Sequence, residues 1–158
     1  HENRINRAVD LDRKLEGLIS IQDLEYEKDW EVVPFLQPIQ IDGVSYCHYF
    51  CTGVKGNPVS TARALVTKKH MSCVMGHVQD VQISMEQRRG DGTPLIGLFC
   101  GIYYEHDEAY LNPQTNHQHR CVWMNREVQD GFFYPHPISL DYLKRTYKNR
   151  LKNTKNII

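Results

Sequence analysis

Residues 60–79, which read STARALVTKKHMSCVMGHVQ, decide the fold. One of the two hydroxyl residues at the start could cap a helix that continues to about Lys69, because hydroxyl oxygens accept hydrogen bonds from free backbone amides. Residues 71–76 then form a short, almost wholly apolar run, which is typical of a strand buried on both faces. After this run, at His77, we expect an exposed loop, where functional side chains usually lie.

Three Asp-Gly dipeptides outside this segment predict turns between pairs of strands. They are Asp42-Gly43, Asp91-Gly92 and Asp130-Gly131. The runs beside them suit β-structure, and a loop with glycine, asparagine and proline is expected over residues 51–60. The expected strands are residues 31–36 continued by 38–41, then 44–50, 81–87, 94–104, 120–128 and 132–134.

Helices are predicted at both ends of the chain. Residues 1–29 carry leucines at helical spacing, so we expect roughly one amphipathic helix there, lying on a surface. A final helix is expected over residues 139–151. A buried strand between helices, together with hairpins, indicates an α/β or α+β fold, a layered β-sheet domain flanked by helices. We expect one domain over residues 1–158.

Charge and cysteine content argue against several classes of function. Lysine and arginine together number 19, as do aspartate and glutamate, so the formal net charge is zero. A nucleic-acid-binding module is therefore disfavoured. The five cysteines form no Cys-x-x-Cys pair, and no segment is long and apolar enough to span a membrane. A reducing cytoplasm is the expected compartment.

Two histidines stand at the ends of predicted strands. His48 ends the run after Tyr46-Cys47, and His77 follows the buried run. A strand fixes such a side chain while the following loop leaves its coordinating face open, so the two could share a metal ion. The alternative is a buried histidine bonded to a backbone carbonyl, the commoner case. The residues alone leave both interpretations open.

The order of these motifs resembles the calcineurin-like metallophosphoesterases, in particular those encoded by phages. That family has, in order, Asp-x-His, Gly-Asp-x-x-Asp, Gly-Asn-His-Glu or Gly-Asn-His-Asp, a lone histidine, and Gly-His-x-His. Here His1-Glu2 resembles the end of the third motif, His48 the lone histidine, and residues 76–79, Gly-His-Val-Gln, the last motif. The resemblance extends through residues 128–147. It implies the C-terminal part of such an enzyme, an incomplete half of its layered sandwich.

Carried over residue by residue, the resemblance implies a metal site and a proton donor. His48 and His77 would ligate the second of two metal ions, and Gln79 stands where the family has another histidine. His1 would meet the substrate phosphate and the leaving oxygen, oriented by Glu2. The ions would be manganese, iron or zinc, because imidazole ligands argue against calcium or magnesium alone. The implied reaction is hydrolysis of a phosphate mono- or diester, with nucleic acid only as a substrate.

The upstream motifs Asp-x-His and Gly-Asp-x-x-Asp have no counterpart in the chain. We therefore expect the chain to be inactive alone. The chain begins at His1 without an initiator methionine, for which processing, truncation and an incomplete sequence are alternative explanations. A C-terminal part alone is expected to expose the apolar flank of residues 71–75. A missing N-terminal half in trans, a second copy of the chain or absent upstream residues would cover it.

Three further polar residues are candidate substrate ligands. Arg4 lies near the start of the first predicted helix, and Lys55 and Asn57 lie in the loop of residues 51–60. All three could meet a substrate phosphate, although a solvated position is the alternative. A second interpretation of the whole chain is non-catalytic, a structural or binding fragment of the family in a viral assembly. If the chain is phage-encoded, the host cytoplasm is the expected location.

Overall fold

The computed structural model describes residues 3–52, 55–105 and 118–155, with side-chain environments for those between residues 4 and 148. The sequence predicts one domain over residues 1–158, and the structure separates into two compact units, His1–Pro34 and Phe35–Ile158. None of the helices in the described ranges has the length and apolar character of a membrane span.

The first unit consists of one short helix and three 3₁₀ turns. Helix α1, Asn3–Leu11, ends where Asp12 is extended and its carboxylate accepts a hydrogen bond from the amide of Lys14 at 3.1 Å. Such local bonds compete with the helix. The prediction of one helix over residues 1–29 is therefore wrong. The turns η1, η2 and η3 follow at Arg13–Leu15, Ile21–Leu24 and Tyr26–Lys28.

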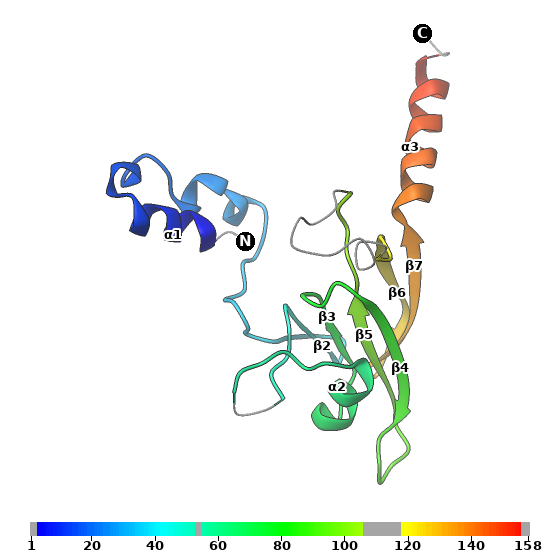
Figure 1. Ribbon diagram of the computed structural model, residues 1–158. Helices are drawn as coiled ribbons and strands as arrows, with labels where there is room; N and C mark the ends of the chain where they lie inside the picture. The colour runs from blue at the N-terminus through cyan, green and yellow to red at the C-terminus, as the bar shows by residue number, and fades with distance from the viewer. Residues whose placement is uncertain (1–2, 53–54, 106–117, 156–158) are drawn as a thin grey trace. The chain divides into compact units, whose positions relative to one another are not determined.

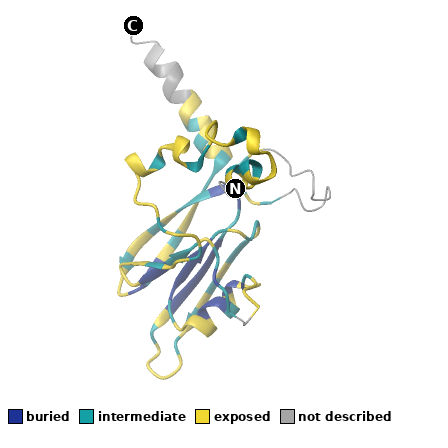
Figure 2. Ribbon diagram, turned by 90° about the vertical axis from the view of Figure 1, so that its left-hand side faces the viewer, coloured by how far each residue is buried: buried dark blue, intermediate teal, exposed yellow. Residues whose placement is uncertain are grey.

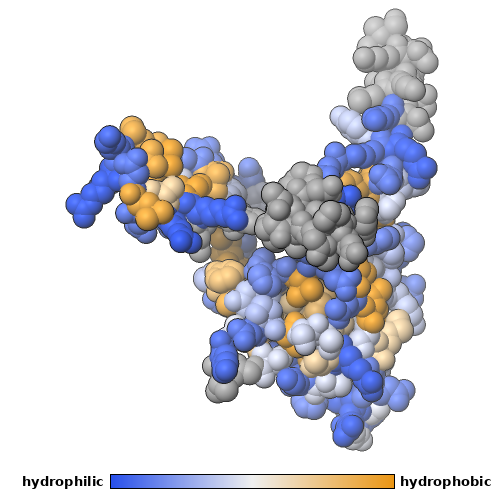
Figure 3. Space-filling model, viewed as in Figure 1, coloured by the Kyte–Doolittle hydropathy of each residue, from blue (hydrophilic) through white to orange (hydrophobic). Residues whose placement is uncertain are grey.

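The side chains of the first unit lie at its surface. No described residue from 4 to 34 is buried, and Leu11 and Leu18 are 79% and 72% exposed. The apolar side chains are visible in orange on this unit in Figure 3. Backbone hydrogen bonds between near neighbours connect the described part of this unit, which has no buried core.

A five-stranded mixed sheet with the order β1-β2-β3-β5-β4 organises the second unit (Figure 1). The central strands β2, β3 and β5 are parallel, and β1 and β4 run antiparallel to their neighbours at the two edges. The predicted mixed α/β architecture is confirmed at this level. The strands are β1 Ile39–Ile41, β2 Val44–Cys47, β3 Cys73–Met75, β4 Val81–Gln87 and β5 Pro94–Cys100.

Residues 31–36 do not form the predicted strand. Pro34 and Pro38 have no amide hydrogen to donate to a sheet, and Leu36 between them has left-handed backbone with a φ of 62°. The sheet consequently begins only at Ile39.

Helix α2, Ala62–Lys69, connects β2 to β3 and packs on one face of the sheet, as the sequence predicts. The hydroxyl of Thr61 caps it by accepting a hydrogen bond from the amide of Ala64 at 3.1 Å. The side-chain oxygen of Gln82 accepts another from the amide of Ala62 at 3.0 Å. The cap and the contact with β4 together fix where the helix begins.

A two-stranded hairpin, β6 Cys121–Gln129 and β7 Phe132–Ser139, packs on the other face of the sheet. Its turn Asp130-Gly131 and the β1–β2 turn Asp42-Gly43 have positive φ at both residues, which is the type I′ geometry that Asp-Gly favours. The two turns meet, because the amide of Gly131 donates to the carbonyl of Asp42 at 3.1 Å. All three predicted hairpins are confirmed.

Helix α3, Leu140–Lys155, follows β7 directly and extends beyond the predicted end at residue 151. The hydroxyl of Ser139 accepts a hydrogen bond from the amide of Tyr142 at 3.2 Å, so the predicted start is confirmed. In Figure 1 the helix continues from β7 away from the sheet.

Strand β3 is buried on both faces by other parts of the same unit (Figure 2). Cys73 and Met75 pack with the α2 side of the core, which includes Leu65 and Phe99. Val74 packs with the opposite side, which includes Phe133 of the hairpin. The expectation that the flank of residues 71–75 lies exposed is therefore wrong, because the hairpin supplies the cover that a missing half was expected to give.

Candidate metal centre

His48 and His77 come together beyond the C-terminal ends of the neighbouring strands β2 and β3. Cys47 at the end of β2 is in register with Met75 at the end of β3, and the strands are parallel. The residues that follow them therefore leave the sheet side by side. Nε2 of His48 and Nδ1 of His77 lie 3.2 Å apart, and the ring centroids are 5.1 Å apart. The predicted convergence of the two side chains is confirmed.

The backbone around His77 forms a tight turn that orients its ring. The amide of Gly76 donates to the carbonyl of His48 at 3.1 Å, which ties the two strand ends together. The amide of Val78 donates to the carbonyl of Gly76 at 2.6 Å, and His77 between them has a φ of 60°. A γ-turn of this hand is rare and costs on the order of 1 kcal/mol, and such strain is often found at functional sites.

Two aromatic rings flank the histidine pair. Phe35 lies 5.6 Å from His48 between ring centroids, and Tyr49 lies 4.6 Å from His77. Both histidines are nevertheless exposed. Because both side chains are exposed, the alternative of buried histidines bonded to a backbone carbonyl does not describe them.

The distance between the two nitrogens fits a shared metal ion. Two nitrogens bound about 2.0–2.1 Å from a tetrahedral zinc ion lie about 3.3 Å apart. The observed 3.2 Å also fits an N–H···N hydrogen bond between the rings. Distance alone therefore permits both a metal pair and a plain hydrogen bond.

The other predicted metal and catalytic residues are less closely tied to this pair. Gln79 is half-buried, and its side-chain oxygen accepts a hydrogen bond from Gln118 at 3.4 Å. His1 and Glu2 lie outside the described residues. Arg4 is exposed in the first unit. Within the described ranges, no three His, Cys, Asp or Glu side chains are grouped to hold a metal.

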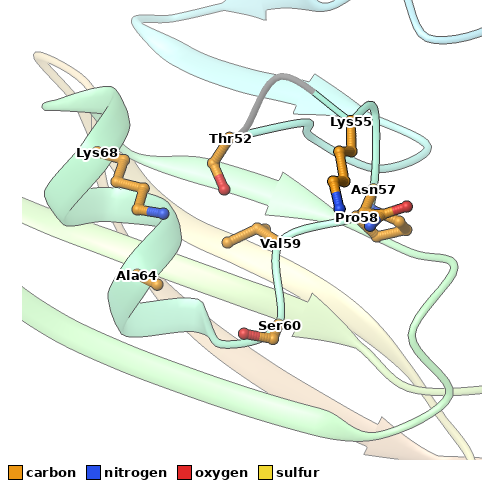
Figure 4. A pocket seen from close by; sticks show the side chains of 8 residues that line it. All are labelled: Thr52, Lys55, Asn57, Pro58, Val59, Ser60, Ala64 and Lys68. Atoms are coloured by element: carbon orange, nitrogen blue, oxygen red, sulfur yellow. The ribbon is translucent and has the colours of Figure 1, made fainter.

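Lys55 and Asn57 line an open pocket of about 360 Å³ between the loop after β2 and helix α2 (Figure 4). Lys68 of α2 lines the same pocket. Reasoning from sequence missed Lys68. The absence of any carboxylate between Asp42 and Asp80 was the signal that could have drawn attention to it.

Two cysteines of the core are poor candidates for metal ligands. Burial raises the pKa of the Cys73 thiol to about 12 and that of the Cys100 thiol to about 11. Both stay protonated at neutral pH, whereas metal ions bind the thiolate. Imidazole nitrogens are therefore better placed than these two thiols to bind a metal.

Comparison with known proteins returned no family model, no curated protein and no solved structure that matches the chain significantly.

Proposed function

We propose that this chain supplies one half of a two-metal phosphoesterase centre, as the C-terminal part of a hydrolase similar to phage-encoded calcineurin-like enzymes. In this proposal His48 and His77 hold the second metal ion, which is manganese, iron or zinc. The observation that carries the proposal is the 3.2 Å separation of two exposed imidazole nitrogens at the ends of adjacent parallel strands. The resemblance of the motifs supplies the reaction.

The residues of this chain would have separate tasks. A pair of bridged divalent ions activates water and neutralises the phosphoryl oxygens in such enzymes. His48 and His77 would position one ion through Nε2 and Nδ1, and Gln79 would offer a weaker amide oxygen to the other. His1, aimed by Glu2, would donate a proton to the leaving oxygen.

The rest of the site would come from residues outside the chain. The family pattern calls for carboxylates and an asparagine that precede His1. A half that carries them, in trans or encoded upstream, remains part of the proposal. Because both faces of β3 are covered, that half would dock elsewhere than on this strand. Cytoplasmic location is also proposed, supported by five cysteines that form no disulfide.

Metal titration tests the histidine pair directly. We expect the purified chain to bind one Co²⁺ or Zn²⁺ ion weakly, because two imidazoles fill only part of a coordination shell. His48→Ala and His77→Ala should each weaken binding at least about tenfold, which is the effect of losing even an outer partner of a ligand. His136→Ala, at an exposed histidine of β7, is the matched control. No binding, or equal binding by all three variants, would contradict the proposal.

Turnover tests the incompleteness of the site. The chain with Mn²⁺ should hydrolyse p-nitrophenyl phosphate and bis-p-nitrophenyl phosphate negligibly, because the carboxylate ligands are lacking. Robust, chelator-sensitive turnover would show that the chain is complete. The encoding gene gives an independent check, since Gly-Asn directly before His1 and Asp-x-His further upstream are expected.

A non-catalytic fragment is the second candidate, and the same 3.2 Å contact favours it if the pair is only a hydrogen bond. In that case both alanine variants should change the free energy of unfolding in metal-free buffer, and added Co²⁺ should not alter it.

A further inference from the structure

The pocket beside α2 is lined by side chains that donate hydrogen bonds, and two of them are positively charged. Lys55 and Asn57 come from the loop after β2, and Lys68 from the helix. In Figure 4 the side chains of Thr52 and Val59 lie between the two lysines, and the ammonium end of Lys55 lies beside Asn57 and Pro58. None of the described residues that line this pocket carries a carboxylate. Its volume of about 360 Å³ is within the range of small-ligand sites.

The positive charge around the pocket is local, since the whole chain is neutral. Between Asp42 and Asp80 the sequence has lysines and an arginine but no carboxylate. Arg63 is paired with Glu86 at 3.2 Å. No ion pair is recorded in the described ranges for Lys55 or Lys68. The two pocket lysines therefore have charge available for a ligand.

Hydrogen bonds hold the base of the loop that carries Lys55 and Asn57. The amide of Val59 donates to the carbonyl of Phe50 at 2.9 Å, and Sγ of Cys51 donates to the carbonyl of Gly56 at 3.2 Å. These two bonds join the two arms of the loop to each other near its root. A pre-positioned loop reduces the entropy lost when a ligand binds.

We propose that this Lys55–Lys68 pocket binds a phosphate group of the substrate. This group is a different one from the phosphate ester that is hydrolysed at the histidine pair. The substrate would then carry at least two phosphates, an inference that rests on the proposed function. Ammonium groups bind phosphate as point charges, and the hydroxyl of Thr52 and the side-chain amide of Asn57 supply further donors. Thr52 follows His48 by four residues, so their Cα atoms are at most about 14 Å apart. One extended ligand reaches both sites.

Calorimetric titration of the full chain with tripolyphosphate, in EDTA, tests the pocket without metal. Lys55→Gln and Lys68→Gln should each weaken binding about tenfold, which is the loss of one charge-assisted hydrogen bond. Lys69→Gln is the matched control, because it removes the same charge from the next residue while the Lys69 ammonium lies 5.6 Å from the Phe50 ring centroid. Its effect should stay below about fivefold. Equal effects at Lys68 and Lys69, or no binding, would overturn the proposal.

Fluorescence anisotropy with single-stranded (dT)12 identifies the bearer of the phosphates. If it is nucleic acid, the logarithm of the (dT)12 binding constant falls with the logarithm of the salt concentration. The slope for the Lys55→Gln/Lys68→Gln variant should be smaller than that of the wild-type chain by about 1.4. Unchanged (dT)12 binding beside lost tripolyphosphate binding assigns the pocket to smaller polyphosphates.

The His48→Ala/His77→Ala variant separates this inference from the proposed function. It should retain tripolyphosphate binding in EDTA, and loss of that binding would contradict a separate phosphate pocket. If wild-type chain binds tripolyphosphate but no Co²⁺, the metal proposal fails and the pocket remains an anion site.

Discussion

Two regions of the molecule differ in whether a core supports them. One is the pair of strand ends that carry His48 and His77, and the other is the segment of residues 4–34. All three residues of β3 are buried, with a helix on one side and a hairpin on the other. In the described part of residues 4–34, no side chain is buried. The two regions show that a candidate residue gains a fixed position only where its element contributes to a core.

This difference separates the candidate site residues into two groups. His48 and His77 follow strands whose register is set by the core, and their nitrogens meet. Arg4 belongs to a helix of nine residues that lies outside any core in the described ranges. Isolated helices of this length are marginal in water. We therefore base the metal proposal on the strand ends alone.

Core truncation should give the largest contrast between the two regions. Phe99→Ala removes a fully buried ring and should lower the free energy of unfolding by about 3–5 kcal/mol. Leu11→Ala, at a side chain that is 79% exposed, should change it by less than about 0.5 kcal/mol. Urea unfolding followed by circular dichroism measures both. A similar loss for the two variants would show that the first unit has a core of its own.

A methyl group added to β5 where α2 packs on it should have the next largest effect on the free energy of unfolding. A Cβ on Gly97 of β5 would lie 2.5 Å from the carbonyl oxygen of Ala62, so Gly97→Ala must displace the helix. We expect a loss of about 1–3 kcal/mol in the free energy of unfolding. Gly76→Ala is the control, because its Cβ would meet only the carbonyl of His48 at 3.8 Å. If both substitutions are neutral, α2 is not seated on β5 as described.

The smallest effect is expected at a surface aspartate of the β4–β5 turn. A hydrogen bond from the Arg88 side chain, together with bonds from Thr93, lowers the pKa of Asp91 from 3.8 to about 2. A lowered pKa stabilises the fold above pH 3.8, and this stabilisation is lost as the pH falls through about 2. Asp91→Asn should therefore lower the urea midpoint slightly at pH 7, and the difference should disappear near pH 2.

Asp12→Asn is the matched control in the first unit. Each aspartate accepts a hydrogen bond from the amide two residues later, at 3.1 Å for Asp12 and 3.0 Å for Asp91. Because the turn at Asp12 touches no core in the described ranges, its substitution should leave the urea midpoint unchanged. A larger effect at Asp12 than at Asp91 would reverse the comparison.

Errors of sequence interpretation occurred where a local signal lacked tertiary support. Leucine spacing suggested a helix through residue 29, yet Asp12 ends it by bonding the backbone. Residues 31–36 have β-forming side chains, but Pro34 and Pro38 withhold the amides that a strand needs. The γ-turn at His77 had no recognisable signal, and the aromatic contacts of the pair had none because they join residues from separate parts of the chain.

The sequence by itself determined the Asp-Gly turns, the helix that ends near Lys69 and the buried strand before His77. Each of these depends on backbone preferences and side chains within a few residues, so a short window contains the cause. Only the tertiary structure decided that His48 meets His77 across 29 residues and that a hairpin covers β3. Strand partners and register are chosen by the apolar surface that they bury together, and no single segment contains that information.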